Sequence, residues 1–330
     1  MQDKKGGMLM EKNLANAPDY VCEITDELGA SRVGLINLIN YRCYPDKIAP
    51  HENFNPQLSQ LYASQFLNLG ELINPIVLFY RGDNKLSSCI RDIILNKPQW
   101  KEISNNNIYK IWVVPPRLKY FLFEHINSLS MLYVADGHHR IQALKVLNEK
   151  LREDSNGFYM SFLLHESQID IQNYDRYYYI ETDALRYLCN KLSLLVLLKQ
   201  DDFSCREKPQ PRICFLINGK WYYGFVKNKS INLLTLTTFL DEIVSGLSKK
   251  GKVLKEDTVF QKDIPSKEKY YKQNNFNFMV IFPRIKANEI EECKKLALLF
   301  PKNSTCIFPK FPDRLFVSNL KNRKIRVNLC

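Results

Sequence analysis

The sequence predicts a mixed α/β fold with two domains, and three observations carry this prediction. Short runs rich in β-branched and aromatic residues, such as "NPIVLFYR" and "NIYKIWVV", indicate buried strands. Between such runs lie segments with apolar residues at every third or fourth position, which indicate amphipathic helices. The chain has 330 residues, of which 45% are hydrophobic, and this length fits about two domains of roughly 150 residues each. Strands and helices do not alternate strictly, so the class is α/β or α+β.

In the first half of the chain, strands and helices follow each other at intervals marked by turn residues. The segment "PQLSQLYASQFLNLGEL" has its apolar residues at helical spacing, and Gly70 supplies a stop at its C-terminal end. Residues 1–32 are mixed in character, and we expect them to form a loosely attached extension. The strands expected in this half are 32–44, 74–81, 107–114 and 131–135, and the helices are 56–69, 89–100, 118–129 and 140–151.

The second half continues with further strands and helices. The Asn-Gly pair Asn218-Gly219 separates two strand-like runs, 212–218 and 220–227, and predicts a tight hairpin. We expect a first domain over residues 33–155 and a mixed α/β C-terminal domain over residues 156–330. The remaining strands expected here are 157–165, 177–180 and 275–282, and the helices are 183–198, 233–247 and 287–300.

The cysteine pattern and the hydropathy of the chain indicate the cellular compartment in which we expect the protein. The nine cysteines are scattered, odd in number, and form no Cys-x-x-Cys pair. This pattern argues against a zinc site or a disulfide framework and fits a reducing cytosol. No stretch has the length and apolarity of a membrane span, which needs about 20 residues, and the N-terminus lacks the apolar core of a signal peptide. We therefore expect a cytoplasmic protein with no membrane partner.

The formal net charge of +12 is compatible with a polyanionic partner. Much of this charge comes from dispersed lysines and from the basic C-terminal end "NLKNRKIRVNLC". The charge by itself therefore does not identify a nucleic-acid-binding protein.

The stretch "MLYVADGHHRIQALKVLNEK" places a polar turn, Asp136-Gly137-His138-His139-Arg140, between an expected strand and an expected helix. Free N–H groups and the positive dipole end of a helix favour an anion there. Gly137 permits close backbone approach, Arg140 and the two histidines offer donors to phosphate, and Asp136 can hold a histidine or a magnesium ion. The turn therefore predicts a phosphate site.

Two other interpretations of the turn remain open at this point. Asp136 can serve as the N-cap of the helix, with exposed histidines beside it and no ligand. A zinc site is less compatible, because adjacent histidines point to different faces and no third ligand stands nearby at metal spacing.

The turn "VADGHHRIQAL" resembles the Asp-Gly-His-His-Arg turn of the ParB/sulfiredoxin-like superfamily, in its free serine kinase branch. Upstream, "IAPHENFNPQLSQLYASQFLNLGELINPIVL" follows the order of that branch: a His-Glu loop, a helix, a Gly and a strand. Downstream, "FLLHESQIDIQNYDRYYYI" and "FPKNSTCIFPKFPDRLFV" are similar to segments of a large bacterial family that shares the turn. The resemblance covers the chain from about residue 33 to residue 320.

This resemblance implies that the first domain is a nucleotide-binding catalytic domain and that the C-terminal domain contributes to the substrate site. The implied activity is transfer of a phosphoryl group from ADP or ATP, with Mg²⁺, to the hydroxyl of free L-serine, which gives O-phosphoserine. Matching the motifs residue by residue, Glu52 corresponds to the catalytic base, and His51 is interpreted as a loop residue. The remaining implied roles are phosphate handling by Asp136, Gly137, His138, His139 and Arg140, Mg²⁺ binding by Asp136, and substrate binding by Ser304 and Thr305.

One departure from the family pattern and several alternatives accompany this prediction. Where the family has a lysine before Ser-Thr, this chain has Asn303, with Lys302 one position earlier. A nucleotide-binding regulator without turnover therefore stays open. A kinase for another hydroxylated metabolite also stays open, because residue spacing does not define an acceptor pocket. ParB-like DNA-binding proteins usually carry a helix-turn-helix domain after this fold, whereas strands return here after residue 155, which argues against such a protein. Sulfiredoxin chemistry needs a cysteine where His138 stands. The sequence does not define the acceptor, the nucleotide or the oligomeric state.

Overall fold

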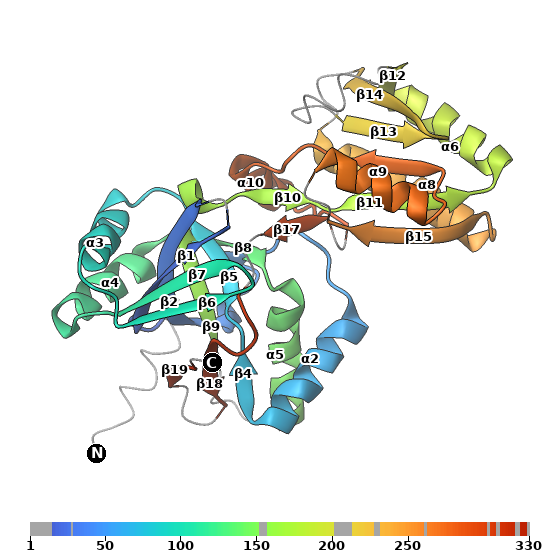
Figure 1. The fold of residues 1–330 in the computed structure, drawn as a ribbon. Helices are drawn as coiled ribbons and strands as arrows, with labels where there is room; N and C mark the ends of the chain where they lie inside the picture. Colours follow the sequence, from blue (N-terminus) through green and yellow to red (C-terminus); the bar gives the residue numbers. More distant parts are fainter. Residues whose placement is uncertain are drawn as a thin grey trace. The chain divides into compact units, whose positions relative to one another are not determined.

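The computed structural model describes residues 15–27, 29–151, 157–200, 213–227, 232–260, 263–301, 304–307, 311–320 and 324–328 (Figure 1). The chain forms two compact units. The first unit comprises the chain up to Asp170 together with the segment from Ile307 onward, and the second unit comprises Ile171–Cys306. Each unit has its own sheet and its own helices.

An eight-stranded sheet forms the centre of the first unit, in the order β3-β8-β5-β9-β2-β1-β7-β6. Neighbouring strands are antiparallel except for the pairs β3–β8 and β5–β9, which are parallel. Strand β2 lies between β1 and β9, so its last seven residues are all buried. The strands are β1 (Tyr20–Thr25), β2 (Ser31–Asn40), β3 (Ile48–Ala49), β5 (Ile76–Tyr80), β6 (Trp100–Ser104), β7 (Asn107–Val113), β8 (Leu132–Asp136) and β9 (Phe158–His165).

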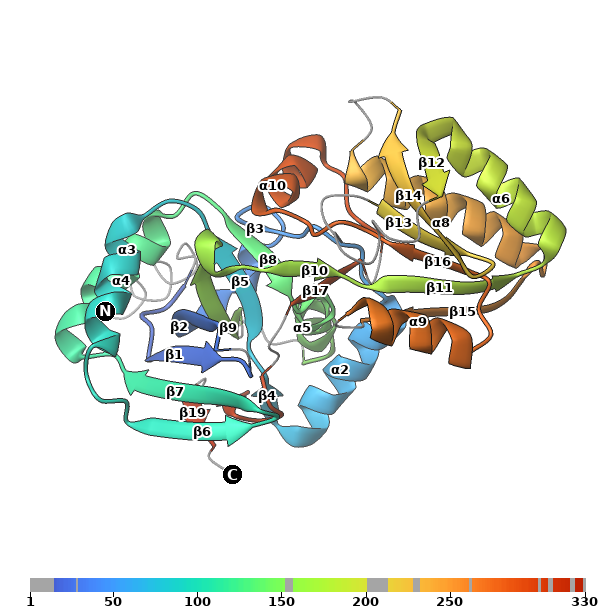
Figure 2. The same cartoon turned by 45° about the horizontal axis from the view of Figure 1, so that its top comes forward.

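Four α-helices flank this sheet, and two of them, α2 and α5, pack side by side (Figures 1 and 2). Asn55 caps α2 by accepting hydrogen bonds from the N–H groups of Gln57 and Leu58, and Pro56 follows at the first helical position. Gly70 ends the helix with a φ of 65°, which confirms the predicted stop. The helices are α2 (Pro56–Leu69), α3 (Asn84–Ile94), α4 (Pro116–Ser128) and α5 (His138–Leu151), with short 3₁₀ turns at Tyr41–Cys43 and Glu166–Gln168.

The expectation of a loose extension over residues 1–32 needs correction, because Tyr20–Thr25 form β1 inside the sheet. This strand pairs with β2 on one side and with β7 on the other, and Val21 and Cys22 are fully buried. In the sequence, the charged residue Glu23 interrupts the apolar run that would indicate a buried strand. Its carboxylate lies 2.7 Å from the Lys110 ammonium on the neighbouring strand β7, so a charged residue is satisfied by a cross-strand partner.

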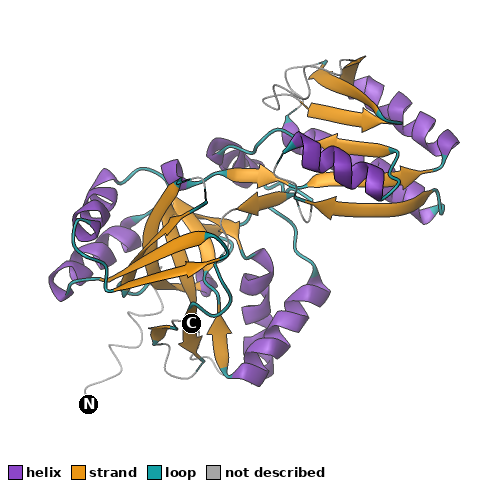
Figure 3. Cartoon of the chain, viewed as in Figure 1, coloured by secondary structure: helices purple, strands orange, loops and turns teal. Residues whose placement is uncertain are grey.

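The second unit is built on a six-stranded sheet in the order β12-β14-β13-β16-β11-β15. Helices and strands of both units are distinguished by colour in Figure 3. Helix α9 packs on one face, where Ile264 and Tyr271 contact Cys214 and Trp221, and α6 and α8 lie on the other face (Figure 2). The elements are β11 (Asp175–Ile180), α6 (Thr182–Leu195), β12 (Val196–Gln200), β13 (Ile213–Ile217), β14 (Lys220–Val226), α8 (Leu233–Lys249), β15 (Val253–Val259), α9 (Ile264–Gln273), β16 (Phe278–Ile281) and α10 (Ala287–Leu296).

Two local predictions for this unit have different outcomes. Asn218 and Gly219 have φ values of 47° and 78°, as a tight hairpin turn requires, and they connect β13 to β14 as predicted. The helix predicted over 183–198 is too long, because α6 ends at Leu195 and Val196 begins β12, where it pairs with Val226. Apolar periodicity alone does not distinguish the end of a helix from a short strand that follows it. Pairing with a neighbouring strand determines that these residues are extended.

The segments that join the two units differ from the predicted division at residue 155. Strand β9 follows that position but pairs with β2 and β5, within the first sheet. The C-terminal segment also returns to the first unit, where β18 (Phe316–Asn319) pairs with β4 (Glu71–Ile73) and with β19 (Ile325–Val327). Strands β10 (Ile171–Asn173) and β17 (Thr305–Ile307) form a separate two-stranded sheet. Within the described ranges, no helix combines the length and apolarity needed to cross a bilayer.

Candidate functional site

The predicted polar turn lies between β8 and α5, and Gly137 is its central residue. Strand β8 ends at Asp136, and α5 begins at His138, with the Gly137 carbonyl accepting the first helical hydrogen bond from the N–H of Ile141 at 3.1 Å. Gly137 therefore occupies the N-cap position that one interpretation gave to Asp136. Its φ is +103°, and a Cβ at this position would lie 2.7 Å from Cγ2 of Ile76. Glycine is thus needed for both conformation and space.

We expect Gly137→Ala to destabilise the first unit by about 2 kcal/mol or more, since backbone strain adds to overpacking. Gly70→Ala is the matched control, because Gly70 also has a positive φ, of +65°, but no atom within 4 Å of the added Cβ. Urea unfolding followed by circular dichroism measures both losses. Equal losses in the two variants would show that the contact with Ile76 has no cost.

Arg140, predicted to grip phosphate, is held by protein groups around the turn. Its Nη2 lies 2.5 Å from Oδ2 of Asp136, one turn earlier on the chain. Its Nη1 donates to the carbonyls of Asn74 at 2.9 Å and Pro75 at 2.7 Å, which connect β4 to β5. The Tyr159 hydroxyl donates to the Asn74 carbonyl as well. Burial opposes the charge of Arg140, but Asp136 and nearby tyrosine hydroxyls outweigh it and raise its pKa.

The predicted catalytic residue Glu52 lies in the loop between β3 and α2, and this loop contacts the first turn of α5 at two points. The N–H of His51 donates to Nε2 of His138 at 3.5 Å, and the N–H of Asn55 donates to Nδ1 of His139 at 3.1 Å. Glu52 lies between these two contacts, with 7% of its surface exposed. The structure therefore brings Glu52 next to the turn, from which it is separated by about eighty residues of sequence.

The three histidines at this junction are electrically neutral near pH 7. Burial lowers the pKa of His51 to about 4, against partial compensation by the Val134 carbonyl and Asp136. Burial also lowers the pKa of His138 well below its usual value, and His51, His139 and Arg140 lower it further. Burial also lowers the pKa of His139, and Arg140 lowers it further, although Asp136 opposes the shift. The site thus offers neutral imidazole donors rather than imidazolium cations.

These pKa shifts predict a loss of stability in mild acid. Below pH 6.5 His51 becomes protonated in the unfolded chain, whereas in the folded protein it stays neutral down to about pH 4. The free energy of unfolding therefore falls as pH decreases through this window, by at most about 1.4 kcal/mol per pH unit for each such histidine. We expect urea unfolding to show a shallower pH dependence in His51→Asn than in the wild type. An unchanged slope in His51→Asn would contradict the expectation.

Ser304 and Thr305, predicted to bind substrate, lie in the second unit. The Ser304 hydroxyl donates to the Pro301 carbonyl at 2.6 Å and accepts from Nη2 of Arg176 at 3.1 Å. Ser304 is buried, with 4% exposure, and Thr305 begins β17. The substrate role of the pair stays a prediction. Lys302 and Asn303, which depart from the family pattern, lie outside the described residues.

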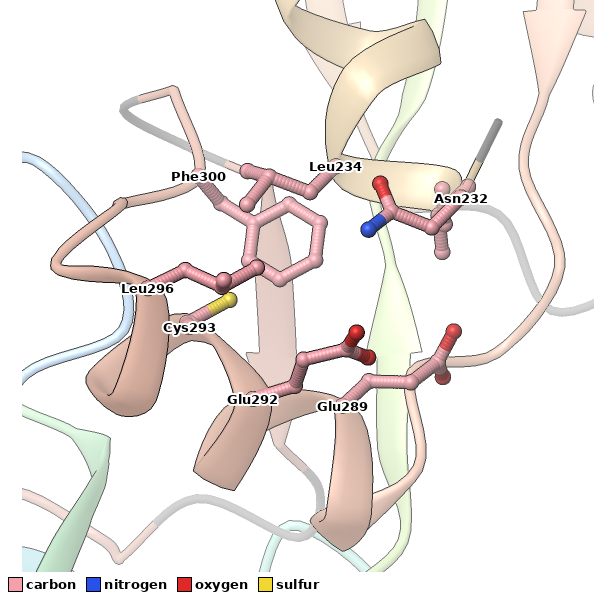
Figure 4. A pocket seen from close by; sticks show the side chains of 8 residues that line it. Asn232, Leu234, Glu289, Glu292, Cys293, Leu296 and Phe300 are labelled. Carbon is pink, nitrogen blue, oxygen red and sulfur yellow. The ribbon is translucent and has the colours of Figure 1, made fainter. Parts of the chain in front are cut away.

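A small pocket also lies in the second unit, between the N-terminal end of α8 and the helix α10 (Figure 4). Its apolar wall includes Leu234 and Phe300, and the carboxylates of Glu289 and Glu292 lie at one side (Figure 4). Glu289 accepts a hydrogen bond from the N–H of Lys286 and so caps α10. The pocket contains none of the predicted site residues.

Sequence reasoning missed the roles of His51 and Asn55 at the site. For Asn55 a signal existed, because Asn followed by Pro at the start of an apolar period is typical of a helix N-terminus. For His51 no local signal existed. The position of its ring is set by two residues more than eighty positions away in the sequence. Its Nδ1 lies 2.6 Å from the Val134 carbonyl oxygen, and its ring centroid lies 4.6 Å from that of His138.

The fold and the site together define a mixed α/β protein in which a strand–glycine–helix turn presents N–H donors beside a buried carboxylate. The chain belongs to the DUF1015 family, described as a protein of unknown function, whose model matches residues 6–243. No curated protein matches the sequence significantly.

The chain is similar to several solved structures at low sequence identity. SbnI with a C-terminal truncation, from Staphylococcus aureus, is 14% identical, with 84% of each chain covered and a TM-score of 0.51. A free serine kinase (E30A mutant) in complex with AMP is 12% identical, covering 83% of this chain and 87% of that one, with a TM-score of 0.49. A conserved hypothetical protein from Pyrococcus furiosus is also 12% identical, covering 88% and 97%, with a TM-score of 0.49. The likeness to SbnI concerns the fold, and it agrees with the predicted mixed α/β class.

Proposed function

We propose that the protein is a small-molecule kinase that transfers a phosphoryl group from ADP or ATP to the hydroxyl of free L-serine. The order of sequence motifs supports the reaction class, and the geometry of the first unit supports the assignment of roles. The observation that carries the proposal is the double contact between the Glu52 loop and the turn, His51 N–H to His138 and Asn55 N–H to His139. A carboxylate and a set of phosphate donors thus share one site.

The phosphate side of the proposed site is built from N–H donors. The N–H groups of the first helical turn have no acceptor within the helix, and within the part of the chain that the structure describes, no hydrogen bond engages the N–H groups of His138 and His139. Neutral histidines add ring N–H groups beside them. Phosphoryl transfer depends mainly on positioning and on neutralising charge, and these donors serve both purposes.

Mg²⁺, which the motif resemblance implies, fits one carboxylate of the turn. No group of three metal-ligating side chains occurs within the described ranges, but Mg²⁺ commonly needs only one or two carboxylates beside substrate phosphates and water. Oδ2 of Asp136 pairs with Arg140, and no described residue hydrogen-bonds to its Oδ1. Asp136 would therefore hold the ion through Oδ1. When bound, Mg²⁺ would offset part of the negative charge on the phosphates.

In the proposed reaction, Glu52 accepts the proton of the serine hydroxyl while the serine oxygen attacks the terminal phosphorus of the nucleotide. A P–O bond to serine forms, and the P–O bond to the leaving phosphate breaks, with its electron pair going to that oxygen. ADP gives AMP and O-phosphoserine, and ATP gives ADP and O-phosphoserine. The first turn of α5 holds the transferred group, and Arg140 positions the turn by anchoring the carbonyls of Asn74 and Pro75.

The test is incubation of the purified protein with ADP or ATP, Mg²⁺ and L-serine, followed by mass spectrometry for O-phosphoserine. A panel of other hydroxylated metabolites runs in parallel, so that a different acceptor is detected as a different phosphorylated product. We expect O-phosphoserine with the wild type and much slower formation of it with Glu52→Gln. Absence of every phosphorylated product, with either nucleotide, would reject the kinase proposal.

A second candidate is a regulator that binds nucleotide without turnover. The contacts of Arg140 favour it, because the guanidinium is used by Asp136, Asn74 and Pro75 and so leaves fewer donors for a transferring phosphoryl group. Calorimetric binding of ADP without any product would support this candidate. A DNA-binding role lacks such support, since the described part of the second unit carries a six-stranded sheet where a helix-turn-helix domain was expected for it.

A further inference from the structure

The loop from His51 to Asn55 contacts both histidines of the turn through backbone N–H groups, and this has a chemical consequence for each ring. We infer that His51 is a positioning residue that anchors this loop, and that the loop fixes the ring nitrogen on which His138 and His139 each carry their proton. The inference deepens the proposed function, because it takes the turn to be a phosphate site.

For His138 the assignment follows from the direction of one hydrogen bond. A backbone N–H can only donate, so Nε2 of His138 must accept from the N–H of His51. A neutral imidazole carries its single proton on the other nitrogen, which is Nδ1 in this ring. Among the described residues, the hydrogen bond to this ring is the one at Nε2. His138 is therefore left with an Nδ1–H donor for a ligand.

For His139 the same reasoning gives the opposite tautomer. The N–H of Asn55 donates to Nδ1 of His139 at 3.1 Å, so this ring carries its proton on Nε2. Asn55 also caps α2 through its side-chain oxygen, which accepts from the N–H of Gln57 at 3.0 Å. The position of the Asn55 N–H is thus set by the start of α2.

His51 fixes the other end of the loop. Its ring Nδ1 lies 2.6 Å from the Val134 carbonyl, which can only accept, so His51 donates through Nδ1–H. Val134 belongs to β8, the strand that leads into the turn. The ring is fully buried and packs edge-to-face on His138, with 4.6 Å between centroids and 81° between planes. The imidazole of His51 therefore ties the Glu52 loop to the strand that carries Asp136.

The consequence is a pair of neutral donors, Nδ1–H of His138 and Nε2–H of His139, with no acceptor nitrogen left toward a ligand. Such a pair matches a group whose oxygens only accept, namely the fully deprotonated terminal phosphate of a nucleotide. The same loop holds Glu52, so the position of the base and the orientation of the phosphate donors depend on one anchor.

Nitrogen-15 NMR of histidine-labelled protein tests the tautomers directly, because the two ring nitrogens have different shifts when protonated. The chain has five histidines, and single His→Gln variants assign each signal. At pH 7 we expect His138 in the Nδ1–H form and His139 in the Nε2–H form, with and without ADP. An Nε2–H form of His138, or an Nδ1–H form of His139, would overturn the inference.

Two substitutions of His51 test its positioning role. Asn keeps a donor near the position of Nδ1, whereas Leu has a similar volume and no donor. We expect His51→Leu to show mixed tautomers at His138 and a kcat lower by about 100-fold, as for a catalytic group displaced by about 1 Å, while His51→Asn keeps single tautomers and a kcat near that of the wild type. Single tautomers and unchanged kcat in His51→Leu would overturn the role of His51.

The outcomes separate this inference from the proposed function. Wild-type protein without phosphoryl transfer rejects the kinase, while its NMR spectrum still shows whether the tautomers are as inferred. Active protein with the opposite tautomers rejects the inference alone. The wild-type spectrum also decides the tautomers if His51→Leu does not fold.

Discussion

Replacing Glu52 with Gln is expected to lower the rate of phosphoryl transfer by about 10²- to 10⁴-fold, the usual contribution of a general base. Gln keeps the size of the side chain but cannot accept the serine proton. Because Glu52 is buried beside two anchored residues, its amide replacement should stay in place and the fold should persist. The measurement is O-phosphoserine formation by mass spectrometry, with circular dichroism as the check on folding.

Glu166→Gln is the matched control for this prediction. Glu166 is also in the first unit, but its carboxylate pairs with Arg81 at 2.7 Å, and 28% of its side chain is exposed. We expect wild-type activity for this control. Full activity in Glu52→Gln would mean that another group takes the proton, or that the reaction does not occur at this site.

Arg140→Met is expected to lower the free energy of unfolding by about 3 kcal/mol, near the lower end for breaking a buried ion pair. The variant removes the Arg140 donors from the Asp136 carboxylate and from the carbonyls of Asn74 and Pro75, although the Asn74 carbonyl keeps the hydrogen bond from the Tyr159 hydroxyl. The loss stays near that lower end because 32% of the Asp136 side chain is exposed, so water can solvate part of its charge. We also expect weaker ADP binding in calorimetry, as the turn loses its anchor.

Arg81→Met separates this buried pair from an ordinary surface pair. Arg81 and Glu166 form an ion pair with 40% and 28% side-chain exposure, and such pairs contribute about 0–1 kcal/mol. Urea unfolding measures both variants. A loss in Arg140→Met no larger than that in Arg81→Met would show that Asn74, Pro75 and Asp136 find water or other partners in its place.

Local features of the fold were well predicted from the sequence. The helix that starts after Asn55 and ends at Gly70 is encoded by its cap, its proline and its stop, all of them short-range effects. The hairpin at Asn218-Gly219 is encoded in the same way, by residues that tolerate positive φ. The position of Gly137 between a strand and a helix was also correct, because the apolar period changes there.

Features that depend on distant partners could not be predicted in this way. Strand β1 contains Glu23, and only the facing Lys110 on β7 makes that charge compatible with an inner strand. In the sequence, Arg140 looks like a cation that is available to a ligand. In the folded protein its Nη1 donates to the carbonyls of Asn74 and Pro75 in the β4–β5 connection. His51 looks like a loop residue because its partners, Val134 and His138, are contributed by tertiary structure.

The return of the C-terminal segment to the first unit bears on the order in which the protein can assemble during synthesis. Strand β4 pairs with β18. The carboxylate of Glu71 forms ion pairs with Nη2 of Arg314 at 2.5 Å and with Nη2 of Arg326 at 3.0 Å. The ribosome delivers these partners only after the whole second unit has been made, although domains usually mature from the N-terminus onward. We therefore expect the second unit to be able to mature first, and the nascent first unit to keep β4 without its partner strand until β18 has emerged.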